Sequence, residues 1–493
     1  MLKIRFKFIC FFLAFSCIGN IFAATFNFGS KSSAIKVGHA DSCLGKVSIS
    51  GGNLSINDGT LLIDHPDENP NLPFRADTAT TQIEIEGSFF DVKDYNGNVH
   101  SSFLNYGRYL PSTQKICLEN EAGSLQSEYG KVLPKIEVNY DGFVISGQPI
   151  FLQSITLQDS SISLTLALQS KLNKDIEMNG GILFLRDDLM LADDVQLRGG
   201  GRVQLNNRRI SLGGKNITWT DDVQWEEAGD IVLNNNMTLN CTWTFEGNGV
   251  LNGNGYALTL GNNGKILVYK NHSSVLFHDI KIEGIAGTNI RCFDHTGTLS
   301  FSNLTWVQDR MFTFTEGRFV VVADTKMQNS SRYKNTPSGG DGYAWPSFNN
   351  VFLFGYGTDQ VSTILSNARL TWDIGFTFSY GPLGTDNRRL IQMTDKSSEI
   401  FMNGATLAAT TTGLVLTKGT MIFDHKNYFY NQDPDRAASA LDESIQFGEG
   451  GSGAYGEEIN DLDIVIMPSA SIELLSGVLY HNCSPAEFIH PGG

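Results

Sequence analysis

The stretch that decides the fold runs from residue 229 to 262 and reads GDIVLNNNMTLNCTWTFEGNGVLNGNGYALTLGN. It aligns without a gap with residues 181–214, GILFLRDDLMLADDVQLRGGGRVQLNNRRISLGG, so that residue 181 matches residue 229 and residue 214 matches residue 262. Self-similarity at a fixed period is the mark of stacked structural units. We interpret this 48-residue offset as two units of about 24 residues, a length suited to three short strands and three turns.

A shorter module recurs along most of the chain. It consists of two alternating apolar residues, two spacers, a Gly and two more alternating apolar residues, at 47–56, 176–185, 312–321, 414–423 and 472–479. Such alternation has the period of a β-strand with one buried side. We expect the Gly to adopt a positive φ, so that the chain turns sharply between two short strands.

Two architectures use this module. Strands that fold back on each other give an antiparallel β-sandwich or hairpin array, whereas a chain that coils onward gives a parallel β-helix. The 48-residue repeat favours the coiling chain. We therefore predict an all-β solenoid, a parallel β-helix with rungs of about 24 residues.

The stretch 245–256, FEGNGVLNGNGY, resembles the rungs of pectin-lyase-like right-handed parallel β-helices. It is also similar to exported bacterial repeat proteins and autotransporter passengers of that fold. The resemblance is clearest over 176–325 and recurs over 351–480. It implies a right-handed solenoid in which Asn side chains ladder between rungs and satisfy turn amides.

Residues 1–24 are typical of a secretory signal peptide. Three basic residues precede an apolar run from Phe8 to Phe22, which is shorter than the ~20 residues of a membrane-spanning helix. We expect an extracytoplasmic protein, secreted or at the cell surface or envelope. Cleavage would leave 33 basic and 52 acidic residues, a net charge of −19, which argues against nucleic acid as a partner.

The rest of the chain divides by composition. We predict an irregular β-rich region over 25–165 that caps the solenoid, a β-helix core over 166–430, and a C-terminal loop with the last rungs over 431–493. A turn-rich insertion interrupts the core near 328–350. A solenoid needs caps because its terminal rungs expose unpaired strand edges.

Motifs that carry chemistry are missing from the sequence. It contains no HExxH, no GxSxG and no phosphate loop, so we predict no catalytic residue, no metal site and no cofactor. The Asp pairs at 187–188, 193–194 and 221–222 favour turn residues over catalytic carboxylates, and the Arg pairs at 208–209 and 388–389 are weak candidates for a basic partner. The five cysteines after residue 24 favour free buried thiols over one or two bridges.

The insertion near 328–350 is the candidate for binding. It holds Tyr333, Asp341, Tyr343 and Trp345 among small polar residues. Long irregular loops on a rigid scaffold often carry binding sites, and aromatic rings beside polar groups suit sugars. The alternative is an insertion that only packs on the rod.

Two functions follow as hypotheses. The first is an exported, non-enzymatic solenoid for surface structure, adhesion or ligand display, with a glycan or a cell-surface molecule as partner. The second is an extracytoplasmic polysaccharide lyase or glycoside hydrolase on a β-helix scaffold, which rests on analogy of fold. Acids that converge with a basic residue on one face would favour the enzyme.

Overall fold

A computed structural model describes the chain over a defined set of segments. They are residues 29–37, 47–49, 53–56, 58–63, 74–76, 82–85, 115–118, 124–127, 132–133, 135–138, 141–151, 153–330, 350–355, 357–382, 387–409, 413–431, 445–448, 461–476, 479–481 and 488–489. These segments contain strands and turns and no helix. The fold is a parallel β-solenoid of about 12 turns, which confirms the predicted class. No described helix could cross a membrane.

The chain divides into two compact units, with the boundary between Thr156 and Leu157. Every strand pair assigned within unit 1 is parallel: β1 with β4, β2 with β5, β3 with β6, β6 with β7, β7 with β10, β8 with β11 and β9 with β12. These strands are β1 (Gly29–Val37), β2 (Val47–Ile49), β3 (Asn53–Ile56), β4 (Asp58–Ile63), β5 (Phe74–Ala76), β6 (Gln82–Ile85), β7 (Lys115–Leu118), β8 (Ser124–Ser127), β9 (Val132–Leu133), β10 (Lys135–Val138), β11 (Phe143–Gly147) and β12 (Ile150–Phe151). β13 (Ile155–Leu157) lies at the boundary. The cap function predicted for this region stays a prediction.

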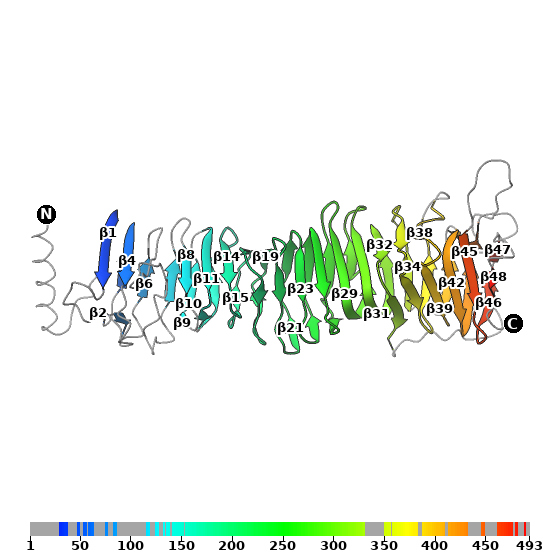
Figure 1. Ribbon diagram of the computed structural model, residues 1–493, viewed down its shortest axis with the longest axis horizontal. Coiled ribbons are helices and arrows are strands. Elements are labelled where there is room, and N and C mark those ends of the chain that lie inside the picture. The colour runs from blue at the N-terminus through cyan, green and yellow to red at the C-terminus, as the bar shows by residue number, and fades with distance from the viewer. Residues whose placement is uncertain are drawn as a thin grey trace, which may run out of the picture. The chain divides into compact units, whose positions relative to one another are not determined.

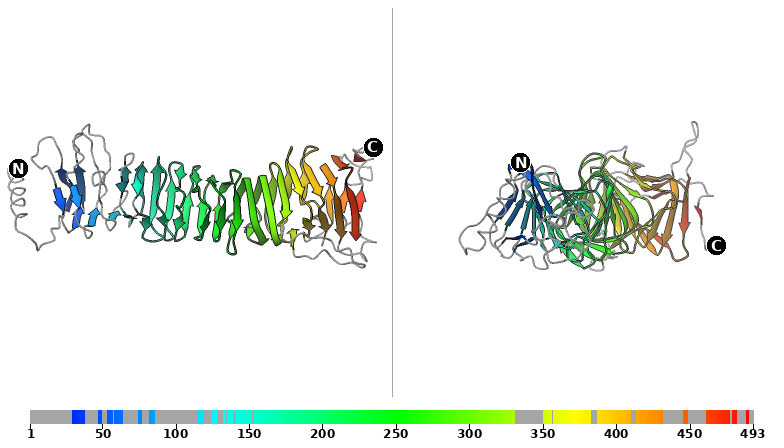
Figure 2. Two further views of the ribbon diagram at one scale, coloured as in Figure 1. Left: turned by 90° about the horizontal axis from the view of Figure 1, so that it is seen from below. Right: turned by 60° about the vertical axis from the view of Figure 1, so that its left-hand side comes forward.

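Unit 2 is built from stacks of parallel strands, each strand pairing with its equivalent one turn later (Figures 1 and 2). The first stack contains β14 (Ser163–Leu168), β16 (Ile182–Leu185), β19 (Gly201–Gln204), β22 (Val223–Glu226), β25 (Thr242–Glu246), β28 (Lys265–Val268) and β30 (Ile290–Cys292). The second contains β17 (Leu189–Met190), β20 (Arg209–Ser211), β23 (Gly229–Val232), β26 (Asn248–Asn252), the start of β29 (Ser274–Gly287), the start of β31 (Thr298–Phe314), β32 (Arg318–Val321), β35 (Ser362–Ile364) and β38 (Ile391–Met393). β15 (Ile176–Glu177) pairs with β18 (Leu197–Arg198).

The third stack contains β21 (Ile217–Trp219), β24 (Met237–Leu239), β27 (Ala257–Leu260), the middle of β29 and β31, β33 (Thr325–Asn329), β36 (Arg369–Trp372), β39 (Glu399–Asn403), β42 (Lys418–Asp424), β45 (Asp461–Ile466) and β48 (Phe488–Ile489). A fourth begins with the end of β31 and continues through β34 (Val351–Phe354), β37 (Thr377–Tyr380), β40 (Thr406–Ala409), β43 (Lys426–Asn431) and β46 (Ser471–Ser476). A short fifth stack pairs β41 (Leu414–Leu416), β44 (Ile445–Phe447) and β47 (Leu479–His481).

The register shows what the 48-residue repeat means. Val203 pairs with Leu183, and Trp225 pairs with Val203. Two whole rungs therefore lead from residue 183 to residue 225, a distance of 42 residues and not 48. Gly249 pairs with Gly229 and lies in the second stack, whereas its repeat equivalent Gly201 lies in the first. Adding 48 to the residue numbers of β16, in the first stack, therefore leads to β23, in the second stack. This step covers two full turns and then one more side of the solenoid. Our interpretation of it as two whole rungs is wrong, because all three sides share one strand-and-turn pattern.

The turn glycines serve in two ways. Gly317 and Gly419 have φ of 78° and 94°, as the module predicts. Gly181 does not have a positive φ, because the bend is made by Asn179 and Gly180, with φ of 50° and 82°. A Cβ on Gly181 would lie only 2.8 Å from the carbonyl oxygen of Ile162, so here Gly permits close packing instead.

The core of unit 2 is a ladder of apolar and aromatic side chains. Phe301 is 1% exposed, and its ring centroid lies 6.2 Å from that of Phe277 and 5.8 Å from that of Phe319 in the neighbouring rungs. Trp243 packs edge-on against Trp219 and Trp225 at 5.4 and 5.3 Å. These contacts agree with the prediction that one side of each alternating strand is buried.

Replacing Phe301 with Ala should lower the free energy of unfolding by about 3–5 kcal/mol, because the ladder would lose a ring and gain a cavity. Phe293→Ala is the matched control, since Phe293 is 42% exposed, and its cost should stay below about 1 kcal/mol. The shift of the urea midpoint measures both. Similar shifts for the two variants would contradict this description of the core.

Candidate functional site

The residues predicted to bind a ligand, Tyr333, Asp341, Tyr343 and Trp345, lie outside the described residues. The described chain leaves the third stack at the end of β33 and re-enters the fourth stack at β34. The predicted insertion therefore falls between two strands of regular stacks. The role of its aromatic residues stays a prediction.

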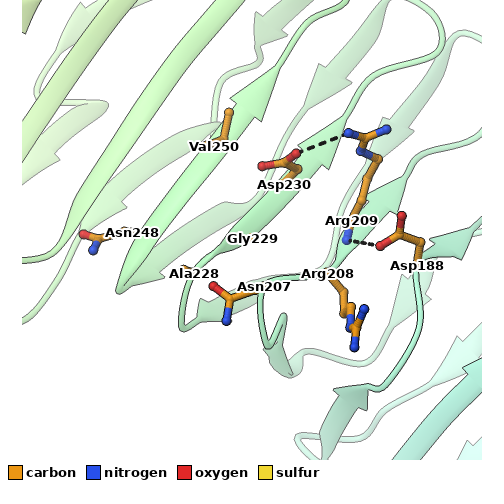
Figure 3. A pocket seen from close by; sticks show the side chains of 9 residues that line it. All are labelled: Asp188, Asn207, Arg208, Arg209, Ala228, Gly229, Asp230, Asn248 and Val250. Atoms are coloured by element: carbon orange, nitrogen blue, oxygen red, sulfur yellow. Dashed lines mark hydrogen bonds and ion pairs between the residues drawn. The ribbon is translucent and has the colours of Figure 1, made fainter.

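A shallow pocket of about 340 Å³ lies on the second stack (Figure 3). Asp188 precedes β17, Arg208 precedes β20, Arg209 is its first residue, and Asp230 belongs to β23. The pocket brings Asp188, one member of the first Asp pair, together with the first Arg pair singled out in the sequence. It is lined by Asp188, Asn207, Arg208, Arg209, Ala228, Gly229, Asp230, Asn248 and Val250.

The polar groups of this pocket are largely engaged with one another. The backbone N–H of Arg209 donates to Oδ1 of Asp188 at 2.9 Å, and its guanidinium lies 3.6 Å from Oδ2 of Asp230. Figure 3 shows the side chains of Arg208 and Arg209 pointing in opposite directions, so the two do not form one clamp. Both partners of the ion pair are more than a third exposed, so it contributes little to stability. These contacts link neighbouring rungs, and they leave no free acid–base pair among the residues that line the pocket.

The other Asp pairs have the same role. Asp193 accepts a hydrogen bond from the N–H of Gly214 at 3.2 Å, and Asp222 accepts one from the N–H of Thr242 at 2.6 Å. Asp194 pairs with Lys215 at 2.9 Å, and Asp221 accepts from the N–H of Gly199 at 3.2 Å. Each bond joins neighbouring rungs, which confirms the prediction that these pairs are turn residues.

Asn side chains complete the turns between rungs. Nδ2 of Asn206 donates to the carbonyl oxygen of Leu185 at 3.2 Å, and Nδ2 of Asn234 donates to that of Leu212 at 2.6 Å. Asn236 accepts from the N–H of Ala257 at 2.9 Å. These Asn side chains satisfy backbone groups of the neighbouring rung, whereas the ladder of stacked Asn side chains stays a prediction.

A second cluster lies on the outward side of the first stack, and sequence reasoning missed it. Gln204, Glu226 and Glu246 occupy equivalent positions on β19, β22 and β25, and we call them the charged row. The side chains of Glu226 and Glu246 are only 11% and 8% exposed. Because adjacent parallel strands lie about 4.8 Å apart, two carboxylates stand close together in a partly dry setting.

Cations and side-chain amides lie beside the carboxylates of the charged row. Glu226 accepts hydrogen bonds from the amides of Gln204 and Gln224, each at 2.9 Å, and lies 3.6 Å from the guanidinium of Arg202. Glu246 forms an ion pair with Lys270, whose pKa is raised mainly by its hydrogen bond to this carboxylate. Lys270 has a φ of 78°, a conformation uncommon for a residue with a side chain. The cluster thus consists of two adjacent mixed-charge groups, one around Glu226 and one around Glu246, spread over the four rungs of β19, β22, β25 and β28.

The signal for the charged row was present in the sequence. Glu226 follows the inward-facing Trp225, and one rung later Glu246 follows the inward-facing Phe245. An alignment at the spacing of single rungs superposes the two glutamates, whereas the 48-residue alignment does not. The other predicted basic pair, Arg388–Arg389, lies between β37 and β38, several rungs after the charged row. Among the described residues, no cluster of His, Cys, Asp or Glu could hold a metal ion.

The described cysteines are buried. Cys241 and Cys292 are free thiols, as the sequence favours, and they are 4% and 1% exposed. Burial raises the pKa of each thiol to about 12, and nearby Asp and Glu carboxylates act in the same direction. Both stay protonated at neutral pH and are poor nucleophiles.

Cys241 and Cys292 should therefore resist alkylation in the folded protein. With iodoacetamide at pH 8, peptides that contain these residues should stay unmodified while the chain is native, because the thiolate is scarce and the sulfur is covered. The same peptides should label fully in concentrated urea. Peptide mass mapping measures both states, and rapid labelling of the native protein would contradict the burial.

Asp188 and Asp187 give a matched pair for the structural role of the Asp pairs. Asp188→Ala removes the acceptor for the N–H of Arg209 and should cost about 1 kcal/mol of unfolding free energy. Asp187 has no hydrogen bond to a described residue, so Asp187→Ala should change stability by less than about 0.5 kcal/mol. Thermal unfolding compares the two variants. Equal losses would show that the inter-rung bond is unimportant.

Comparison of the chain with protein-family models, with curated proteins and with solved structures found no match.

Proposed function

We propose that this protein is an exported, non-enzymatic β-solenoid that serves in surface structure, adhesion or ligand display. The proposal rests on the bonding of the carboxylates within the rungs. In the described part of the chain, the Asp pairs and the charged row bond to the neighbouring rung or to adjacent cations. A scaffold needs such bonds, whereas an acid–base catalyst needs a carboxylate that is available to the substrate. The signal-like segment and the acidic charge support an extracytoplasmic place.

Export is testable by fractionation. The full chain expressed in a bacterium should appear outside the cytoplasm, shortened at its N-terminus by about 24 residues, as the signal-peptide pattern requires. A variant without residues 2–24 should stay in the cytoplasm. Immunoblotting of fractions and N-terminal sequencing measure the result. Retention of the full chain in the cytoplasm would contradict the proposal.

A polysaccharide-acting enzyme is the second candidate, and one observation favours it. Glu226 and Glu246 lie on adjacent rungs beside Arg202 and Lys270, which is the convergence of acids and bases that an enzyme of this architecture would require. Paired carboxylates at short range are also the arrangement of retaining glycosidases. Their existing ion pairs and hydrogen bonds weigh against this interpretation.

An activity assay separates the two candidates. Purified protein incubated with neutral and acidic polysaccharides should release no reducing ends and no unsaturated sugar above the level of a Glu226→Gln, Glu246→Gln variant. The double substitution keeps the size of both side chains and removes their charge. Product release that disappears in this variant would establish the enzyme and overturn the non-enzymatic proposal.

A further inference from the structure

The outward side of the first stack changes character along the solenoid. After Gln204, Glu226 and Glu246, the next equivalent positions hold Tyr269 and Phe293, because the N–H of each bonds to the carbonyl oxygen in the preceding rung, at Phe245 and Val268. Tyr269 is 49% exposed and Phe293 is 42% exposed. We call these two residues the aromatic pair. A charged row thus continues directly into two exposed rings on the same stack.

The aromatic pair is ordered by its own contacts. The two ring centroids lie 5.5 Å apart with the planes at 61°. The guanidinium carbon of Arg291 lies 4.5 Å from the centroid of Phe293, a cation–π contact that fixes the ring from one side. The rings therefore form a preformed apolar platform, and the cost of ordering them is met before any ligand arrives.

The guanidinium of Arg291 lies beside the platform and has no ion-pair partner among the described residues. Nε of Arg291 is buried and has no hydrogen-bond partner, and no ion pair joins its guanidinium to a carboxylate of the described residues. By contrast, Lys270 and Arg202 in the same stack are each paired with a glutamate. This Nε is covered by protein, so a ligand on the surface would bond to the terminal guanidinium nitrogens of Arg291. The platform thus combines two ring faces with one cation that lacks an acceptor among the described residues.

These features fit one class of ligand better than others. A protein partner would need an apolar patch of several hundred Å², far larger than two rings bordered by charges. Nucleic acid is disfavoured by the net charge of −16. A pyranose ring has an apolar C–H face that stacks on aromatic rings and a rim of hydroxyl groups that bond to charged side chains. One sugar of an extended chain is also about as long as the spacing of adjacent rungs, about 4.8 Å.

We propose that the aromatic pair, together with Arg291 and Lys270, is a docking site for an extended oligosaccharide that runs along the first stack. Sugar rings stack on Tyr269 and Phe293, and the guanidinium of Arg291 donates to an oxygen of the sugar, either a hydroxyl or a carboxylate. Lys270, whose side chain is 61% exposed, bonds to hydroxyls of the adjoining sugar. This inference rests on the proposed role in ligand display and specifies its ligand class.

Isothermal titration calorimetry of the full chain tests the site. Three hexasaccharides serve as probes: cellohexaose and chitohexaose, which are uncharged, and hexagalacturonate, which carries carboxylates. We expect saturable binding of at least one probe. The Tyr269→Ala, Phe293→Ala double variant should bind about tenfold more weakly or not at all, because it loses the stacking surface. Tyr256→Ala, which removes an exposed ring at 37% exposure before the third-stack strand β27, is the control and should bind as the unmodified chain does.

Arg291→Gln distinguishes the two kinds of oxygen ligand. If the carboxylate is bound, this variant should lose affinity for hexagalacturonate at least tenfold, and its affinity for the uncharged probes should change less than about threefold. If hydroxyls are bound, uncharged probes should bind to the unmodified chain and lose affinity in the same variant. Circular dichroism confirms that each variant is folded.

Two results would overturn the inference. One is the absence of binding by all three probes, and the other is binding that the double aromatic variant leaves unchanged. Neither touches the proposal of a non-enzymatic exported scaffold, which fails instead through product release or cytoplasmic retention. A failed glycan site and a failed scaffold are therefore separate outcomes.

Discussion

The stacking of parallel strands one rung above another is the constraint on which the rest of unit 2 depends. Each strand pairs with its equivalent in the next turn, so a residue at an inward position always lies over the same position of the preceding rung. Phe277, Phe301 and Phe319 form a continuous ladder for this reason. Parallel pairing satisfies the strand backbone, but it leaves the turns with unpaired amides and carbonyls. The sequence must complete them with side chains.

Asn and Asp perform that task, and this explains much of the polar composition. Asn206 and Asn234 donate to carbonyl oxygens of the preceding rung, while Asp188 and Asp222 accept from amides of the following rung. An acidic residue in such a turn is a structural acceptor before it is anything else. The abundance of carboxylates in the chain therefore does not by itself indicate catalysis.

The same geometry creates surfaces that no local motif reveals. Residues that are one rung apart in the sequence become neighbours, so Glu226 and Glu246 meet, and the row they begin continues into Tyr269 and Phe293. Both carboxylates of this row are paired with adjacent cations, whereas Tyr269 and Phe293 are exposed and Arg291 has no carboxylate partner among the described residues. A solenoid thereby produces a linear face suited to a linear ligand. This geometry is the physical reason for our proposal of ligand display.

The sequence by itself determined the parallel β-solenoid, because alternation, turn residues and self-similarity are local properties. It also indicated the structural role of the Asp pairs and the burial of Cys241 and Cys292. It did not determine which side of the rung a repeat copy occupies, since the three sides share one pattern, and the 48-residue offset joins Gly201 in one stack to Gly249 in another. Only the tertiary structure, through its strand register along the first stack, decided that Glu226 meets Glu246 and that the row ends in an exposed aromatic pair. Register is a long-range property, because small changes in turn length move every later contact.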